Sequence, residues 1–176
     1  MKLLFIADPL QSFKIYKDTT FAMMREAQRR GHTLAVCEPQ HISWQRGSKV
    51  TARVCDIHLT GEPVQWYTAQ PERMAALASF DAVLMRKDPP FDSEYFYATH
   101  LLEQAERDGA RVFNKPRALR DHPEKLAIME FPDLIGPTLV TRDAADIQRF
   151  HAEHQDIILK PLDGMGGMGI FRVGPD

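Results

Sequence analysis

Four glycines within six residues, set between two β-type segments, limit what this chain can fold into more than any other feature. Gly164, Gly166 and Gly169 match the G-x-G-x-x-G pattern of a dinucleotide-binding turn, but such a turn has to open a helix. Here Ile-Ile-Leu-Lys precedes the loop and Ile-Phe-Arg-Val follows it. The sequence therefore predicts a hairpin of strands 157–160 and 170–173, whose loop can lay backbone N–H groups over phosphates.

Two lysines are candidates to contact the same phosphates. Lys160 ends the strand that leads into the glycine loop, and Lys125 lies in a segment predicted to be helical. As point charges they suit the α- and β-phosphates of ATP. No lysine directly follows the glycines, which excludes a P-loop. A flexible hairpin turn stays open as the alternative for the loop, and a solvated surface lysine as the alternative for Lys125.

The first 113 residues alternate between apolar runs and helical periodicity. This order predicts an α/β domain with a mostly parallel sheet and helices on both faces. Around residues 50–59 the alternation slips in phase at Cys55-Asp56, which indicates either two antiparallel strands or one bulged strand. The predicted strands are 3–7, 33–37, 82–85 and 111–113, and the predicted helices run from an N-cap at Asp18 to Gly31, over 71–79 and over 93–108.

Near residue 121 the pattern changes, and we predict two domains, 1–121 and 122–176, joined within 115–123. The second part is expected to begin with a helix over 123–129, followed by a strand at 138–141 and a helix at 143–154 with Ile147 and Phe150 facing inward. The glycine hairpin completes it.

Arg86-Lys87-Asp88-Pro89-Pro90 follows a predicted parallel strand, and open α/β sheets bind ligands at the carboxyl ends of such strands. The planar fork of Arg86 matches a carboxylate. A surface turn with a salt bridge to Asp88 is the alternative. One of the bonds preceding the two prolines can be cis. Lys17 and Asp18 follow the first strand's loop and can approach the same crevice, although an N-cap role already explains Asp18.

Composition excludes several classes of protein. With 22 Lys and Arg against 24 Asp and Glu, the net charge of −2 argues against nucleic-acid binding. Cys37 and Cys55 cannot form a disulfide framework, and no apolar run is long enough to span a membrane. The N-terminal apolar run breaks at Asp8-Pro9, as in a first strand rather than a signal peptide. We expect a cytoplasmic protein.

His151 and His154 lack a third ligand, so we expect no metal site there.

Four segments in order resemble prokaryotic glutathione synthetases. The nucleotide hairpin "IILKPLDGMGGMGIFRV" is the most specific of them, together with the turn in "VLMRKDPPFDSEYFYATHLLE". "KDTTFAMMREAQRRGH" and "NKPRALRDHPEKL" agree in order and spacing. The resemblance covers nearly the whole chain apart from about 40–75.

This resemblance implies a pre-ATP-grasp N-terminal domain followed by the beginning of an ATP-grasp domain. It implies ATP-dependent ligation of γ-glutamylcysteine and glycine to glutathione through an acyl phosphate, with Mg²⁺ as cofactor and a homo-oligomer as the full-length form. The residues matching Lys125, Lys160 and the loop (Gly164, Met165, Gly166, Gly167 and Gly169) bind ATP, and Arg86, Lys87 and Asp18 are expected on the substrate side.

The resemblance also implies that the metal ligands and catalytic residues lie beyond residue 176, so we expect no ligase turnover from residues 1–176 alone. The alternatives are another ATP-grasp carboxylate–amine ligase and a truncated, non-catalytic nucleotide-binding module. The turn at 83–92 favours the glutathione enzyme over its sister ligases, because the nucleotide hairpin is shared more widely.

Overall fold

The computed structural model describes residues 1–175, which form two compact units. The first unit comprises Met1–Asp88 and Asp92–Asp121. The second comprises Pro89–Phe91 and the described part of the chain after Asp121.

The centre of the first unit is parallel, as the alternation predicts. β1 (Lys2–Ile6) pairs with β2 (Thr33–Cys37) on one side and with β7 (Ala82–Met85) on the other, parallel to both. β8 (Val112–Phe113) continues the sheet, parallel to β7. The main path of this eight-stranded sheet runs β3-β4-β2-β1-β7-β8.

The other side of the sheet is antiparallel and centres on one long strand, β4 (Thr51–Leu59). Its first half pairs with β3 (Ile42–Ser43) and β6 (Arg73–Ala76), and its second half pairs with β2 and β5 (Tyr67–Ala69). The partners of β4 change near Cys55 and Asp56, both half-buried. The phase slip in the sequence therefore marks one continuous strand.

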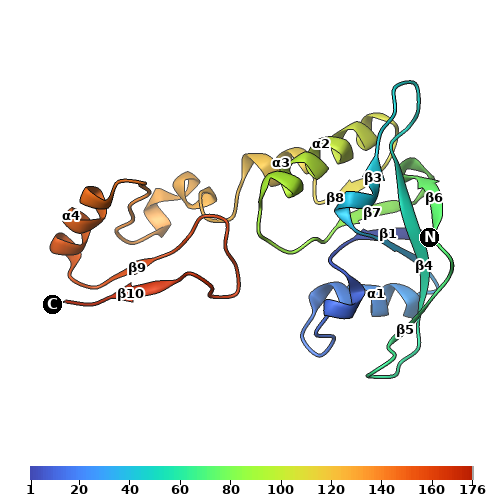
Figure 1. Cartoon of the computed structure of the whole chain (residues 1–176), viewed down its shortest axis with the longest axis horizontal. Coiled ribbons are helices and arrows are strands. Elements are labelled where there is room, and N and C mark those ends of the chain that lie inside the picture. The colour runs from blue at the N-terminus through green and yellow to red at the C-terminus, as the bar shows by residue number, and fades with distance from the viewer. Residues whose placement is uncertain (176) are drawn as a thin grey trace. The chain divides into compact units, whose positions relative to one another are not determined.

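Helices cover both faces of this sheet (Figure 1). α1 (Thr19–Arg29) lies on one face, and α2 (Ser93–Arg107) and α3 (Pro116–Asp121) lie on the other. α1 begins as predicted: the Phe21 N–H donates to Asp18 Oδ1 at 2.8 Å, which satisfies one of the free amides of the first turn.

The core between α1 and the sheet is apolar on both sides. Met24 and Ala27 of α1 are one helical turn apart and face the strands. The buried members of this cluster are Phe5, Leu10, Met24, Ala27, Leu34, Val36, Ile57, Leu59 and Trp66. Short 3₁₀ helices lie at Leu10–Ser12, Pro39–His41 and Leu77–Ser79.

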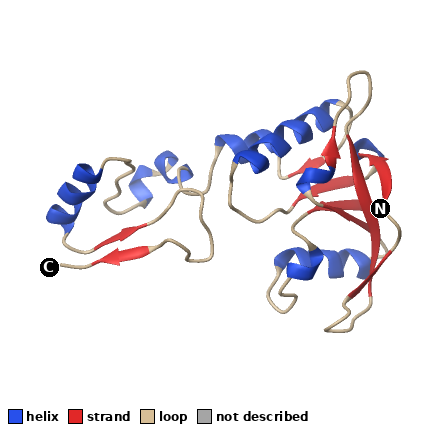
Figure 2. Ribbon diagram, viewed as in Figure 1, coloured by secondary structure: helices blue, strands red, loops and turns tan. Residues whose placement is uncertain are grey.

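The second unit is smaller and less buried. It contains α4 (Ala144–His154) and the antiparallel pair β9 (Ile157–Leu159) and β10 (Phe171–Val173), seen as the two red arrows beside the glycine loop in Figure 2. Asp143 caps α4 by accepting the Ala145 N–H at 2.8 Å. Two 3₁₀ helices, Ala127–Glu130 and Pro132–Leu134, precede α4.

Three predicted elements are wrong. The segment 71–79 is not a helix: it is β6 followed by a 3₁₀ turn, because pairing with β4 outweighs the helical propensity of Met-Ala-Ala-Leu. The helix predicted over 123–129 is a turn and a 3₁₀ helix. Pro123 disfavours helical backbone at His122, so α3 ends at Asp121.

The third wrong element is the strand at 138–141. These residues are irregular, and in the described part of the second unit the sheet consists of β9 and β10 alone. A segment with a strand-like sequence becomes a strand only where a neighbouring strand pairs with its backbone N–H and C=O groups.

Both cysteines are free, as expected, with Cys37 buried and Cys55 half-buried. Burial raises the pKa of the Cys37 thiol to about 12. No helix within residues 1–175 is long and apolar enough to cross a membrane.

Candidate functional site

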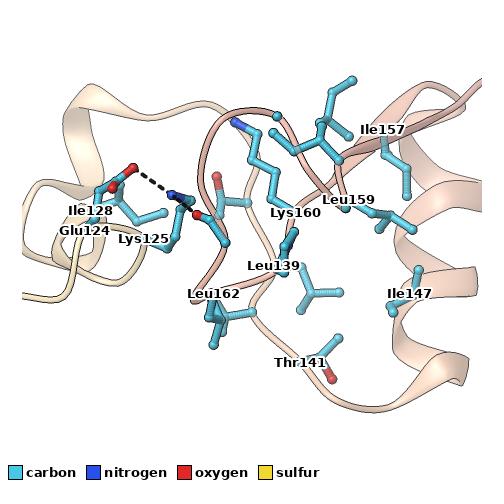
Figure 3. Close-up of a pocket in the computed structure, with 18 of the residues that line it drawn as sticks. Glu124, Lys125, Ile128, Leu139, Thr141, Ile147, Ile157, Leu159, Lys160 and Leu162 are labelled. Atoms are coloured by element: carbon cyan, nitrogen blue, oxygen red, sulfur yellow. Dashed lines mark hydrogen bonds and ion pairs between the residues drawn. The ribbon is translucent and has the colours of Figure 1, made fainter. Parts of the chain in front are cut away.

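A hollow of about 1310 Å³ lies in the second unit, between α4, the hairpin and the loops that precede them (Figure 3). This volume exceeds the roughly 300–1,000 Å³ of ordinary ligand pockets, so a nucleotide fits. One wall is apolar and includes Leu139, Ile147, Ile157 and Leu159. Ile147 and Phe150 both line the hollow from α4, which agrees with their predicted inward orientation.

Lys125 and Lys160 both line this hollow together with the glycine loop. Lys125 Nζ lies 2.6 Å from Glu124 Oε1 and 3.4 Å from the Gly164 carbonyl oxygen, as the dashed lines in Figure 3 mark. Lys160 is exposed and leaves the end of β9 beside the loop. Lys125 and Lys160 are 35 positions apart in the sequence, yet both bring positive charge to the glycine loop.

The glycine loop is shaped by positive backbone angles and by one proline. Gly166, Gly167 and Gly169 have φ values of 64°, 82° and 70°, which favour glycine. A Cβ added at Gly164 would lie 2.8 Å from Cγ of Pro161, closer than side chains approach one another. Met165 and Met168 also line the hollow. Glycine at 164 is therefore required by the close approach of Pro161.

A second group of polar side chains gathers in the first unit, where β1 has its parallel neighbours on both sides. The chain goes from β1 through α1 to β2, and later returns to β7 on the other side of β1. Such a point, where the strand order reverses, leaves a crevice at the carboxyl ends of the strands, and ligands of open α/β sheets bind there.

Arg86 lies at this point, one residue after β7, and its backbone N–H donates to the Ile6 carbonyl at 2.7 Å. Its side chain donates from Nε to Thr20 Oγ1 at 3.1 Å and from Nη2 to Thr19 Oγ1 at 2.9 Å. Neutral hydroxyls orient the guanidinium without cancelling its charge. Among residues 1–175 it has no ion-pair partner, so the predicted alternative, a salt bridge to Asp88, is not formed.

Lys87, by contrast, is paired with a carboxylate. Its Nζ lies 2.7 Å from Asp8 Oδ1 and donates to the Asp88 carbonyl at 2.8 Å. The other oxygen of Asp8 accepts the Asp88 N–H at 2.9 Å. The Pro89–Pro90 bond that follows is cis, as the sequence allowed.

The charges around this turn influence one another. Burial raises the pKa of the Asp88 carboxyl, and the negative charges of Asp8 and Asp18 raise it further, while Lys87 and Arg86 oppose the shift. Burial also raises the pKa of the Tyr95 hydroxyl. Asp18, which caps α1, directly precedes Thr19 and Thr20, the two residues whose hydroxyls bond to Arg86. Lys17 lies 6.0 Å from the centre of the Tyr16 ring.

Neither unit offers a metal site within residues 1–175, where no group of three or more His, Cys, Asp or Glu side chains could hold an ion. His151 donates from Nε2 to the Gly174 carbonyl at 2.8 Å, and His154 packs against the Phe150 ring at 4.3 Å between centroids. Mg²⁺ prefers oxygen ligands, so this histidine pair does not fit a Mg²⁺ ion.

Sequence reasoning missed Asp8, Thr19 and Thr20. Asp8 carried a usable signal, because it directly follows the first buried strand at the edge where ligands bind. Thr19 and Thr20 carried none, because threonine in a first helical turn is ordinary. Their partner, Arg86, lies 66 or more residues away.

Two family models and several curated relatives match this chain. Residues 1–120 match the family described as "Prokaryotic glutathione synthetase, N-terminal domain", and residues 124–176 match "Prokaryotic glutathione synthetase, ATP-grasp domain". The glutathione synthetase of Ralstonia nicotianae is 57% identical over 176 residues, which cover 100% of this chain and 54% of the relative. That of Neisseria meningitidis serogroup B is 52% identical over 177 residues, covering 98% and 55%.

This chain thus spans about half the length of these relatives. A solved structure of the ATP-grasp ligase PsnB, complexed with a phosphomimetic variant of its minimal precursor, Mg and ADP, is similar in fold. It has a TM-score of 0.50 and 19% identity, over 97% of this chain and 57% of that one. The two matched domains together account for nearly every residue, and the chain belongs to the prokaryotic glutathione synthetase family.

Proposed function

We propose that the full-length protein containing this chain joins γ-glutamylcysteine to glycine and forms ADP and phosphate from ATP. In this proposal residues 1–121 are the pre-ATP-grasp substrate domain, and residues 122–176 are the first part of the ATP-grasp domain. The observation that carries the proposal is the contact of Lys125 Nζ with the Gly164 carbonyl, at 3.4 Å, in a hollow that Lys160 also lines.

The nucleotide would be held by charge and by backbone amides. Lys125 and Lys160 supply two ammonium groups, and the loop residues Gly164, Met165, Gly166, Gly167 and Gly169 supply backbone N–H groups, four of them from glycines without a side chain. Leu139 and Ile157 line one wall of the hollow with apolar groups, and a lower local dielectric strengthens attraction between ammonium and phosphate. When bound, ATP supplies the phosphoryl group that activates the cysteinyl carboxylate for attack by the glycine amine.

The dipeptide side is proposed to be the crevice at Arg86. A guanidinium that is oriented by two hydroxyls, and that no carboxylate within residues 1–175 pairs with, suits a substrate that carries two carboxylates. Lys87 and Asp18 belong to the same surface, Lys87 through its pair with Asp8 and Asp18 as the cap of α1. We also propose, from family membership alone, a cytoplasmic homo-oligomer that uses Mg²⁺ held by residues outside this chain.

The test is an assay of the full-length protein with γ-glutamylcysteine, glycine, ATP and Mg²⁺, with glutathione and ADP followed by mass spectrometry. Lys160→Ala should raise the KM for ATP at least about tenfold, equivalent to roughly 1.4 kcal/mol. Arg149→Ala is the matched control, because it removes an exposed cation from the same unit, and neither Arg149 nor its partner Asp146 lines the hollow.

Arg86→Ala should raise the KM for the dipeptide by about tenfold or more, because a charge-assisted hydrogen bond contributes roughly 1.5–3 kcal/mol. Arg111→Ala, which removes an exposed arginine from the same unit, should leave it unchanged. ADP release only with another acid and amine would identify a sister ligase. Nucleotide binding without turnover by the full-length protein would identify a binding module.

A further inference from the structure

Asp8 lies at the point where β1 leaves the sheet. The N–H of Ala7 still bonds to the Cys37 carbonyl of β2 at 3.0 Å, and the N–H of Arg86 bonds to the Ile6 carbonyl at 2.7 Å. The residue that follows Ala7 is Asp8. Its side chain therefore lies within reach of the turn that follows β7.

Both carboxylate oxygens of Asp8 are used on this turn. Oδ1 pairs with Lys87 Nζ at 2.7 Å, and Oδ2 accepts the Asp88 N–H at 2.9 Å. Lys87 Nζ closes the ring by donating to the Asp88 carbonyl at 2.8 Å. The side chains of Asp8 and Lys87 are only 26% and 25% exposed, so solvent and salt screen this pair less than a surface pair.

The turn is thus held from two directions. From β1, Asp8 holds Lys87 and the Asp88 backbone; from α1, Thr19 and Thr20 hold the guanidinium of Arg86. Because Asp8 takes up the lysine charge, Arg86 stays the cation of the turn without a carboxylate partner within residues 1–175. A carboxylate ligand would meet an arginine whose backbone and side chain are both held in place.

We propose that Asp8 is a positioning residue of the dipeptide site, which acts through Arg86 and does not touch the substrate. This inference rests on the proposed function, in which Arg86 binds a substrate carboxylate. Removing the Asp8 carboxylate leaves the Lys87 ammonium half-buried without its partner and the Asp88 N–H without its acceptor. The turn then relaxes, and Arg86 loses part of its orientation toward the ligand.

Asp81 provides a matched control at the opposite end of the same two strands. It precedes β7, its Oδ2 accepts the Lys2 N–H of β1 at 2.7 Å, and its Oδ1 lies 3.8 Å from Arg111 Nη2. Like Asp8, it uses one oxygen on a backbone amide and the other on a cation: the amide is that of Lys2 in β1, and the cation, Arg111, directly precedes β8. Asp81→Ala therefore removes a comparable link at the edge of the sheet away from Arg86.

The experiment measures steady-state kinetics of the full-length protein with Asp8→Ala, Asp8→Asn and Asp81→Ala. Asp8→Ala should raise the KM for γ-glutamylcysteine about tenfold while the KM for ATP and kcat stay within about twofold. Asp8→Asn keeps an acceptor for the Asp88 amide and should give an intermediate effect. Asp81→Ala should lower the melting temperature to a similar extent and leave every KM unchanged.

A double variant tests whether Asp8 acts through Arg86. The KM of Asp8→Ala/Arg86→Ala for the dipeptide should equal that of Arg86→Ala, because residues that act as one unit are not additive. Multiplied effects, or an unchanged KM in Asp8→Ala while Arg86→Ala raises it, would overturn the role of Asp8 and leave the proposed function intact. An Arg86→Ala variant with unchanged KM would overturn both the Arg86 contact and this inference.

Discussion

Gly164 is the residue in the glycine loop that has least room for a side chain. A Cβ there would lie 2.8 Å from Pro161 Cγ and 3.4 Å from the Met168 carbonyl oxygen. We predict that Gly164→Ala weakens ATP binding about tenfold or more, because the loop must shift to relieve a contact with rigid proline and backbone atoms. Isothermal titration of ATP into the full-length protein measures the loss.

The control for this prediction is Gly136→Ala, since a Cβ at Gly136 meets nothing within 4 Å. It should bind ATP with unchanged affinity. Because Pro161 is the nearest obstacle, the double variant Gly164→Ala/Pro161→Ala should recover part of the loss. Equal affinity in Gly164→Ala and wild type would show that the loop accommodates a methyl group.

Asp88 carries a pH dependence of stability. Its pKa is raised, first by burial and then by Asp8 and Asp18, so the folded state favours the neutral carboxyl. The stability from this group is thus fully present below the ordinary carboxyl pKa of about 4 and is lost as pH rises through the higher folded value.

We therefore predict that Asp88→Asn stabilises the protein near neutral pH and that the gain disappears as pH falls toward about 3. The gain should stay below about 1 kcal/mol, because Asp88 is exposed and water screens its charge. Urea unfolding at a series of pH values measures it. A gain that persists undiminished at low pH would point to another cause.

At the scale of elements, Gln28 joins α1 to β4. Its Nε2 donates to the Leu59 carbonyl at 2.9 Å, and its Oε1 accepts the Leu59 N–H at 2.7 Å. One side chain thus satisfies both backbone groups at the end of the longest strand. These two hydrogen bonds hold α1 against β4, in the antiparallel half of the sheet.

We predict that Gln28→Ala lowers the free energy of unfolding by about 2 kcal/mol, since two half-buried backbone groups lose their partners. Gln40→Ala is the matched control: this exposed glutamine bonds to Glu38 two residues away, and its removal should change stability by less than about 0.5 kcal/mol. Chemical denaturation measures both, and equal midpoints for the two variants would refute the role of Gln28.

The elements that sequence reasoning located correctly are those whose signals are local. The strand alternation of the sheet centre, the cap at Asp18 and the helix over 93–108 depend on residues a few positions apart. The segment of β6 has a helical pattern, but its strand conformation comes from pairing with Thr51–Val54, about twenty residues earlier in the chain. Local propensity cannot report a partner at that separation.

At the scale of the whole molecule, burial is concentrated in the first unit. Within residues 122–175, Ile157 is the single buried apolar side chain, whereas β1, β2, β4 and β7 each contribute several. Exposed apolar residues of the second unit include Phe131, Leu134 and Phe171, at 55%, 81% and 63%. The hydrophobic contribution to the stability of this chain therefore comes mainly from residues 1–121.

The candidate site was predictable in its parts but not in its assembly. The glycine pattern between two β segments indicated a hairpin over phosphates, and Arg86 after an apolar run indicated a ligand contact at a strand end. The family resemblance connected these parts to one activity. The contact between Lys125 and Gly164 spans 39 residues, and the one between Asp8 and Asp88 spans 80.

The sequence by itself determined the α/β class, the glycine hairpin and the residues that can carry charge to phosphates and carboxylates, because periodicity and backbone preference act over a few residues. Only the tertiary structure decided which of those residues meet. Asp8 and Lys87 became partners because β1 and β7 are parallel neighbours, whose carboxyl ends lie at one edge of the sheet. That neighbourhood depends on the path of the whole chain, which no local pattern encodes.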